Sequence, residues 1–311
     1  MINRPADEIE ILAEGLLFPE GPVWHRDGSV AFVEIGRGTV SRWSPDGGVH
    51  VVAETGGGPN GLAVGPDGAY YVCNNGGFRF SDEGGYYRPV APAVDHPDGR
   101  IERVDPQTGK VERLYERCGA FPLNGPNDLV FDARGGFYFT DTGRVRHRDR
   151  DHGGVYYALA DGSQISEIAY PVLTPNGIGL SPDGKILYVA EMEPARLWAY
   201  DILSPGVLAK QPFPVLNGGR LVVGLGGYRR LDSLAVAASG NICLGTLVEG
   251  CVTIVSPAGE VVGRAMTPDP YCTNICFGGP GYKTAFLTMS LTGRLGRCTW
   301  HEAGLKLEYE G

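Results

Sequence analysis

One short phrase recurs along this 311-residue chain, and it constrains the fold more than any other feature. Each copy consists of a polar residue, a short apolar stretch, a turn that contains glycine and a second apolar stretch. The copies begin at Glu20, Asn60, Asn127, Asn176, Asp232 and Thr273, and the last two are weaker than the rest. The unit is about 40 residues long, with insertions in some copies, and a unit of that size suits four short strands.

Turn signals divide each unit into strands. Glycine and proline supply 48 and 23 residues, roughly twice their ordinary share. In the first unit we expect strands at 20–24, 29–35, 39–43 and 49–53, because Asp-Gly between apolar runs is a hairpin signal. No long segment with a 3.6-residue period interrupts the pattern. Each unit therefore reads as a meander of antiparallel strands.

Six such meanders in succession favour radial stacking, because none of them can bury both of its faces alone. We therefore expect an all-β protein in which residues 1–311 form a single six-bladed β-propeller domain with a central channel. Two β-sandwiches or a β-solenoid are the competing architectures. Sandwiches do not predict a polar residue at the same place in every copy.

Composition and charge narrow the classes of partner. Hydrophobic residues make up 42% and charged residues 20% of the chain, as in a globular protein. The net charge of −9 and the absence of a basic run argue against a nucleic acid partner. No stretch approaches the roughly 18 apolar residues that span a bilayer, and the N-terminal residues lack the apolar core of a secretory signal, so we expect no membrane partner and a cytoplasmic location. The seven cysteines are scattered and should be reduced, and the oligomeric state is left open.

The first strand of each blade lines the channel of a propeller, so the six residues that begin the copies should face the axis. Every one of them carries an oxygen, two are carboxylates and none is basic. Taken singly, each Asn or Asp has an ordinary alternative as a turn residue. As a set they favour one hard divalent cation such as calcium, magnesium or manganese, with carboxylate-bound zinc as an alternative. Asn60 and Thr273 are the two best suited to a supporting role.

Such an ion would polarise a carbonyl oxygen and acidify a bound water, which favours hydrolysis of an ester or a lactone. Asp232 would then be a metal ligand, the base that activates the water, or both. Covalent catalysis is disfavoured, because the chain has no GxSxG motif and its six histidines show no pairing with a nucleophile. His25 follows Glu20 by five residues and should lie at the opposite face of the propeller.

Three insertions are expected on the face where the polar residues lie. They span 74–99, 142–154 and 217–230, and long loops gathered on one face suggest a cup for a substrate. The first insertion contains residues that suit ring stacking and polar binding, although an ordinary packed loop would also contain them: Phe78, Phe80, Tyr86, Tyr87, Arg88 and His96. As contacts of the substrate we predict Asn60, Asn75, Phe78, Arg88, Asp141 and Tyr228.

Several phrases resemble the gluconolactonase and senescence-marker-protein family, which includes regucalcin-like proteins. They are PEGPVW at 19–24, LNGPNDLVFD at 123–132, FYFTDTG at 137–143 and PNGIGLSPDGKILYVAE at 175–191. The resemblance implies a six-bladed propeller with one catalytic divalent metal, reported in the family as calcium, zinc, manganese or magnesium. It places the metal ligands at Glu20, Asn127, Asn176 and Asp232, and it implies hydrolysis of sugar-acid lactones such as gluconolactone or xylonolactone in carbohydrate metabolism.

The chain also departs from that family. Animal members have a lactone-binding arginine where this chain has Gly125, and the Asp232-Ser233 pair resembles calcium-dependent lactonases related to the paraoxonases. We therefore expect a metal-dependent lactonase, with two alternatives. One is a related propeller hydrolase that acts on aromatic lactones, aryl esters or organophosphates. The other is a metal-free propeller, either similar to strictosidine synthase or purely ligand-binding.

Overall fold

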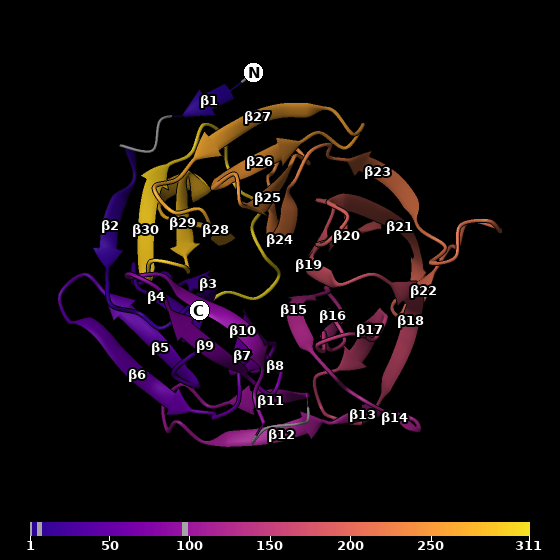
Figure 1. Cartoon of the computed structure of the whole chain (residues 1–311), viewed down its shortest axis with the longest axis horizontal. Coiled ribbons are helices and arrows are strands. Elements are labelled where there is room, and N and C mark those ends of the chain that lie inside the picture. Colours follow the sequence, from indigo (N-terminus) through magenta and orange to yellow (C-terminus); the bar gives the residue numbers. More distant parts are fainter. Residues whose placement is uncertain (1, 5–7, 95–98) are drawn as a thin grey trace.

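The fold is a ring of β-sheets around a central channel (Figure 1). The structure is a computed structural model that describes residues 2–4, 8–94 and 99–311. In these residues six sheets of at least four strands follow one another around the axis, and no α-helix occurs. The expected six-bladed β-propeller is confirmed. Among the same residues no helix is long and apolar enough to cross a bilayer, and the cytoplasmic location stays a prediction.

The first three blades follow the chain from its inner strand outward. Blade 1 comprises β3 (Pro19–Trp24), β4 (Val30–Glu34), β5 (Thr39–Ser44) and β6 (Gly48–Glu54). Blade 2 comprises β7 (Pro59–Val64), β8 (Tyr70–Asn74), β11 (Arg100–Val104) and β12 (Val111–Tyr115). Blade 3 comprises β15 (Pro126–Phe131), β16 (Gly136–Asp141), β17 (Gly153–Leu159) and β18 (Ile165–Val172).

The next three blades complete the ring. Blade 4 comprises β19 (Pro175–Leu180), β20 (Ile186–Glu191), β21 (Arg196–Ser204) and β23 (Arg220–Gly224). Blade 5 comprises β24 (Arg230–Val236), β25 (Ile242–Leu247), β26 (Cys251–Val255) and β27 (Val261–Met266). Blade 6 comprises β28 (Cys272–Gly278), β29 (Thr284–Met289), β30 (Arg294–Thr299) and, from the start of the chain, β2 (Glu10–Ala13).

Short elements decorate the blades. A hairpin of β9 (Phe78–Asp82) and β10 (Tyr87–Pro92) interrupts blade 2, and β13 (Arg117–Cys118) pairs with β14 (Phe121–Pro122) before blade 3. Strand β22 (Val207–Leu208) extends blade 4, β1 (Ile2–Arg4) lies parallel to β27, and a 3-10 turn spans Pro280–Tyr282. The pairing of β2 with β30 closes the ring, because it joins the beginning of the chain to its last blade.

Aspartates of the repeated turns set the first hairpin of several blades. The Asp27 carboxylate accepts a hydrogen bond from the Ser29 amide at 3.0 Å, and Asp67 and Asp183 accept in the same way from the amides two residues later. A side chain that caps its own turn favours the turn over an extended chain. Apolar residues of the strands then fill the wedges between neighbouring blades, as Tyr71, Phe131 and Phe137 do between blades 2 and 3.

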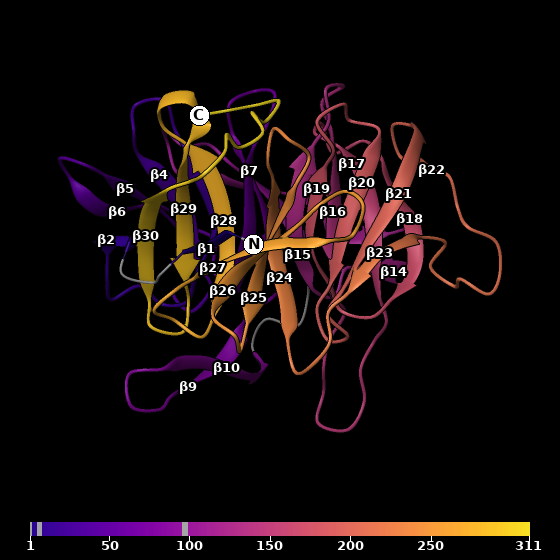
Figure 2. The ribbon, with the colours of Figure 1, turned by 90° about the horizontal axis from the view of Figure 1, so that it is seen from above.

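The two ends of the channel are covered differently (Figure 2). The β9–β10 hairpin and the loop between β16 and β17 project from one end, which we call the lid face. The C-terminal segment 305–311 crosses the other end, which we call the tail face. The stretch 217–230 differs from the expectation, because Arg220–Gly224 form the outer strand β23 and only residues 225–229 remain as a connecting loop.

Candidate active site

The first strands of the six blades converge on the channel, and each carries its repeat-start polar residue near its beginning. All six side chains, which together we call the polar ring, are buried, with exposed fractions between 0 and 7%. A β-bulge disturbs the register of every first strand at this level, for example between Glu20 and Val23 and between Leu231 and Leu234. A bulge re-aims side chains relative to the pleat, so residues that ought to alternate between faces can both reach the channel.

Glycine after the polar residue lets neighbouring first strands touch through their backbones. A Cβ on Gly61 would lie 2.5 Å from the Asn127 carbonyl oxygen, and one on Gly177 would lie 2.7 Å from the Asp232 carbonyl oxygen. Both distances are far below van der Waals contact, so only glycine fits between these strands. The absence of a side chain at these positions therefore determines how closely the polar residues gather.

Glu20, Asn176 and Asp232 are brought together from blades 1, 4 and 5. Burial raises the pKa of Glu20 well above its usual value, and the nearby carboxylate of Asp232 raises it further. Burial likewise raises the pKa of Asp232 to about 7, although a hydrogen bond from Asn176 and the charge of Arg230 oppose that shift. Two buried carboxylates that repel each other are costly unless a cation or a proton lies between them.

The other three repeat-start residues contribute unequally. The Asn127 Oδ1 atom is buried, and no described residue offers it a hydrogen bond. Thr273 is occupied by its own blade, since its hydroxyl lies 2.9 Å from that of Thr288 and 2.5 Å from that of Ser290. It also donates toward Glu20, which makes it a supporting residue. Asn60 is 6% exposed at the same level of blade 2.

Asp128 and Ser233 are functional candidates that the sequence reasoning missed. Burial raises the pKa of Asp128 to about 7, and the carboxylate of Asp232 contributes to the shift. Asp128 accepts a hydrogen bond from the Ser233 hydroxyl, which also lies 3.4 Å from Asn176 Oδ1. The available signal was the residue after each repeat-start position, which is glycine in blades 1, 2 and 4 but polar in blades 3, 5 and 6.

Two predicted substrate contacts lie in or beside the β9–β10 hairpin. The hairpin reaches from blade 2 toward blades 1 and 6, where the Tyr87 amide donates to the Leu291 carbonyl at 2.9 Å. Phe78 lies in an aromatic cluster with Phe80, whose ring stacks on Tyr87 at 4.3 Å. Arg88 pairs with Glu83 at 2.8 Å, so its guanidinium already has a partner within the hairpin.

Three further predicted contacts, Asn75, Asp141 and Tyr228, have different surroundings. Asn75 is buried, and its Nδ2 atom has no hydrogen-bond partner in the described part of the chain. The Asp141 carboxylate accepts hydrogen bonds from the amides of Asn124, Gly125 and Gly143 at 2.7–2.8 Å, so in this structure it holds the loop before β15 in place. Tyr228 is 79% exposed in the loop after β23.

Asp141 is one example of a role that recurs around the ring. Glu34, Asn74 and Glu191 also end the second strand of their blade, and each accepts a hydrogen bond from the amide of the loop that precedes the first strand. These buried side chains position the beginning of the first strands, and hence the polar ring. Of the remaining lid residues named from the sequence, Tyr86 is exposed and His96 lies outside the described residues.

His25 lies on the tail face, as expected. Its Nε2 atom is 2.9 Å from the Tyr70 hydroxyl, and the neighbouring Arg26 amide donates to the carbonyl of Gly311. Burial lowers the pKa of His25 to about 4. His25 is thus a neutral, buried histidine on the face opposite the polar ring. Its hydrogen bond to Tyr70 belongs to the packing between blades 1 and 2.

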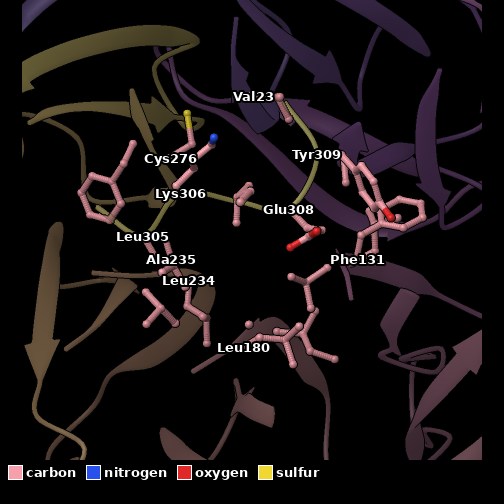
Figure 3. Close-up of a pocket in the computed structure, with 18 of the residues that line it drawn as sticks. Val23, Phe131, Leu180, Leu234, Ala235, Cys276, Leu305, Lys306, Glu308 and Tyr309 are labelled. Carbon is pink, nitrogen blue, oxygen red and sulfur yellow. The ribbon is translucent and has the colours of Figure 1, made fainter. Parts of the chain in front are cut away.

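The tail face holds a cavity of about 320 Å³ (Figure 3). Apolar residues of the first strands line it, among them Val23, Phe131 and Leu234, and the C-terminal segment covers it. Asp128 contributes to its inner wall, so the cavity is the half of the channel beyond the polar ring. The tail therefore lies across this end of the channel, opposite the lid face.

The donor set at the ring fits a hard divalent cation. Among the described residues there is no group of three or more His, Cys, Asp and Glu side chains suited to a metal, so amide oxygens would have to complete the coordination. The buried, unpartnered Oδ1 of Asn127 and the repelling pair of Glu20 and Asp232 are the observations that favour a bound cation. Oxygen donors of this kind suit calcium, magnesium or manganese.

Comparison with known proteins identifies similar chains. Residues 18–290 match the model of a family described as SMP-30/Gluconolactonase/LRE-like region. A gluconolactonase of Zymomonas mobilis is 28% identical, over 91% of this chain and 79% of its own length. The lactonase drp35 of Staphylococcus saprophyticus is also 28% identical, over 84% of this chain and 72% of its own. A calcium-binding protein, regucalcin, from Agrobacterium tumefaciens shares the fold with a TM-score of 0.76 at 18% identity, over 99% of this chain and all of that one.

Proposed function

The chain belongs to the SMP-30/gluconolactonase/LRE-like family, and on that premise we propose that it is a metal-dependent lactonase acting on a small-molecule lactone. The relatives support the enzyme class, since they are named gluconolactonase and lactonase, and these are hydrolases of the lactone ester bond. The observation that carries the proposal is the buried pair of Glu20 and Asp232, gathered with two asparagines around the channel axis. A sugar-acid lactone such as gluconolactone is the proposed substrate.

In this proposal Glu20, Asn127, Asn176 and Asp232 hold one divalent ion, calcium by preference. The ion would supply Lewis acidity that polarises the lactone carbonyl and lowers the pKa of water. The donor set supports it, because each of the four residues presents an oxygen from the first strand of a different blade. The regucalcin that shares this fold is described as a calcium-binding protein, which agrees with the choice of calcium, although that likeness is one of fold.

Asp232 is the proposed base. With a pKa near 7 in the absence of a cation, its carboxylate is poised to accept a proton from water at neutral pH. Asn176 donates a hydrogen bond to this carboxylate and thereby orients it toward the axis. Because the C-terminal segment lies across the tail face, the attacking water and the lactone would both enter from the lid face.

The test is turnover of gluconolactone, followed with a pH indicator. Chelated enzyme should lose activity, and adding back calcium, magnesium, manganese or zinc should restore it and rank the metals. The variant Asp232→Ala should lose at least about 1,000-fold in kcat, since it removes both a ligand and the base. Its circular dichroism should stay that of the wild type.

A matched control is Asp183→Ala, which removes a carboxylate from an exposed turn on blade 4. It should keep wild-type turnover. Turnover retained in Asp232→Ala would reject the mechanism, and turnover indifferent to chelation together with the absence of metal in the purified protein would reject the metal.

A further inference from the structure

Within the described residues, the rim of the lid face carries two clusters of salt bridges, which we call shared bridges. In each of them one glutamate contacts two arginines. Arg230 Nη2 lies 2.5 Å from Glu193 Oε1, and Arg150 Nη2 lies 3.9 Å from Glu193 Oε2. Arg229 Nε lies 2.5 Å from Glu249 Oε2, and Arg264 Nε lies 3.7 Å from Glu249 Oε1. Each bridge contains two positive charges and one negative charge. The rim of blades 3 to 5 therefore has an excess of positive charge in a chain whose net charge is −9.

The bridge of Arg230 borders the polar ring. Arg230 precedes Asp232 by two residues on β24, and its charge lowers the pKa of that carboxylate. Because Arg230 begins β24 and its charge acts on the Asp232 carboxylate, Arg230 lies close to the ring on the side where the first strands begin. Arg150 reaches the same glutamate from the loop between β16 and β17, and Glu193 lies in the loop between β20 and β21. Two loops of the rim and the first residue of β24 therefore meet at this carboxylate.

The hydrogen-bonding capacity of Arg230 is not used up by the protein. Its Nε atom is buried, and no described residue accepts a hydrogen bond from it. A buried, unsatisfied donor costs about 1–3 kcal/mol, and more when it belongs to a charged group. Elsewhere in the same loop as Arg150, Arg146 is matched by both Asp149 and Asp151. Arg264 Nε of the second bridge is also buried without an acceptor among the described residues, so unsatisfied guanidinium donors belong to the two shared bridges.

We propose that Arg230 and Arg150 form an oxyanion-binding subsite beside the polar ring, and that the preferred substrate is a lactone bearing a carboxylate or phosphoryl group. The inference rests on the proposed lactonase function. A guanidinium binds carboxylate and phosphoryl oxygens through paired N–H donors, and the excess of positive charge beside the ring suits such a group. A neutral lactone would leave that excess charge unbalanced.

The experiment compares three lactones: glucono-δ-lactone, a glucaric acid lactone with a free carboxylate, and 6-phosphoglucono-δ-lactone. The measured quantity is the ratio of kcat/KM for each anionic lactone to kcat/KM for the neutral one. We expect a ratio above 10 in the wild type for at least one anionic lactone. It should fall about 10- to 100-fold in Arg230→Gln, the loss expected from a charge-assisted hydrogen bond, and by a smaller factor in Arg150→Gln.

The matched control is Arg26→Gln, which removes one positive charge from the tail face, where Arg26 pairs with Glu310 at 3.2 Å. Its ratio should equal that of the wild type. The two anionic lactones show whether the subsite prefers a carboxylate or a phosphoryl group.

Three results would overturn the subsite: a ratio near 1 in the wild type, an equal loss for neutral and anionic lactones in Arg230→Gln, or an equal effect of Arg26→Gln. Turnover of the neutral lactone by the metal-loaded wild type belongs to the proposed function, so the two ideas fail separately. Should no lactone be opened, calorimetric titration with the same neutral and anionic lactones decides the subsite alone. Binding of an anionic lactone that is tighter than that of the neutral one, and that Arg230→Gln abolishes, supports it, and equal binding of all three overturns it.

Discussion

Gly177→Ala is the substitution that most directly tests how the polar ring is assembled. Gly177 lies between Asn176 and the backbone of β24, and an added Cβ would be 2.7 Å from both the Asp232 carbonyl oxygen and the Leu234 amide nitrogen. Ordinary contact begins near 3.4 Å, so β19 and β24 would have to separate by about 0.7 Å. The methyl group would thus push apart two residues proposed to hold the same ion.

The magnitude follows from packing and from the size of the protein. Overpacking of this kind costs roughly 1–3 kcal/mol. Unfolding entropy of about 2.1 cal/mol/K per residue gives about 0.65 kcal/mol/K for this chain, so the melting temperature should fall by about 2–5 °C. A displacement approaching 1 Å within a catalytic constellation costs up to about 100-fold, so kcat/KM should fall about 10- to 100-fold.

Thermal unfolding by circular dichroism and lactone turnover measure the two effects. The matched control is Gly226→Ala, because a Cβ on Gly226 meets nothing within 4 Å, and it should leave both quantities unchanged. Wild-type turnover in Gly177→Ala would refute the reasoning, even with a lowered melting temperature. It would mean that the close approach of the strands supports stability alone.

Two further predictions concern stability. The pKa of His25 falls from 6.5 to about 4 on folding, so its contribution is present above pH 6.5 and is lost as pH falls toward 4, by roughly 3 kcal/mol in all. Urea unfolding at several pH values should show His25→Gln with a flatter profile than the wild type, and parallel profiles would contradict this. Deletion of residues 1–14 removes β2 and exposes the edge of β30, so the truncated chain should melt earlier and aggregate in light scattering. A truncated chain that stays monodisperse with an unchanged melting temperature would show that the ring closes without it.

Local sequence patterns were enough to predict the number of blades and the position of the polar ring at the beginning of the first strands. The repeated polar residue, the Asp-Gly turns and the short apolar runs are properties of adjacent residues, and a period near 40 residues leaves few ways to bury the strands. The same reasoning located Glu20, Asn176 and Asp232, which the fold gathers, and placed His25 at the opposite end of the channel.

Contacts between residues far apart in the sequence decided the rest. The Asp141 carboxylate, predicted as a substrate contact, accepts hydrogen bonds from three backbone amides, and no local pattern predicts the two that come from the loop before β15. Asp128 entered the channel because a bulge re-aims it, and a bulge is visible only once two strands are paired. The outer strand of blade 6 came from the start of the chain, and the contacts of Arg150 and Arg230 with Glu193 join blades 3, 4 and 5. Sequence alone therefore determined the repeating unit and its polar positions, because these depend on neighbouring residues, whereas partners and charge balance depend on residues that only the closed ring brings together.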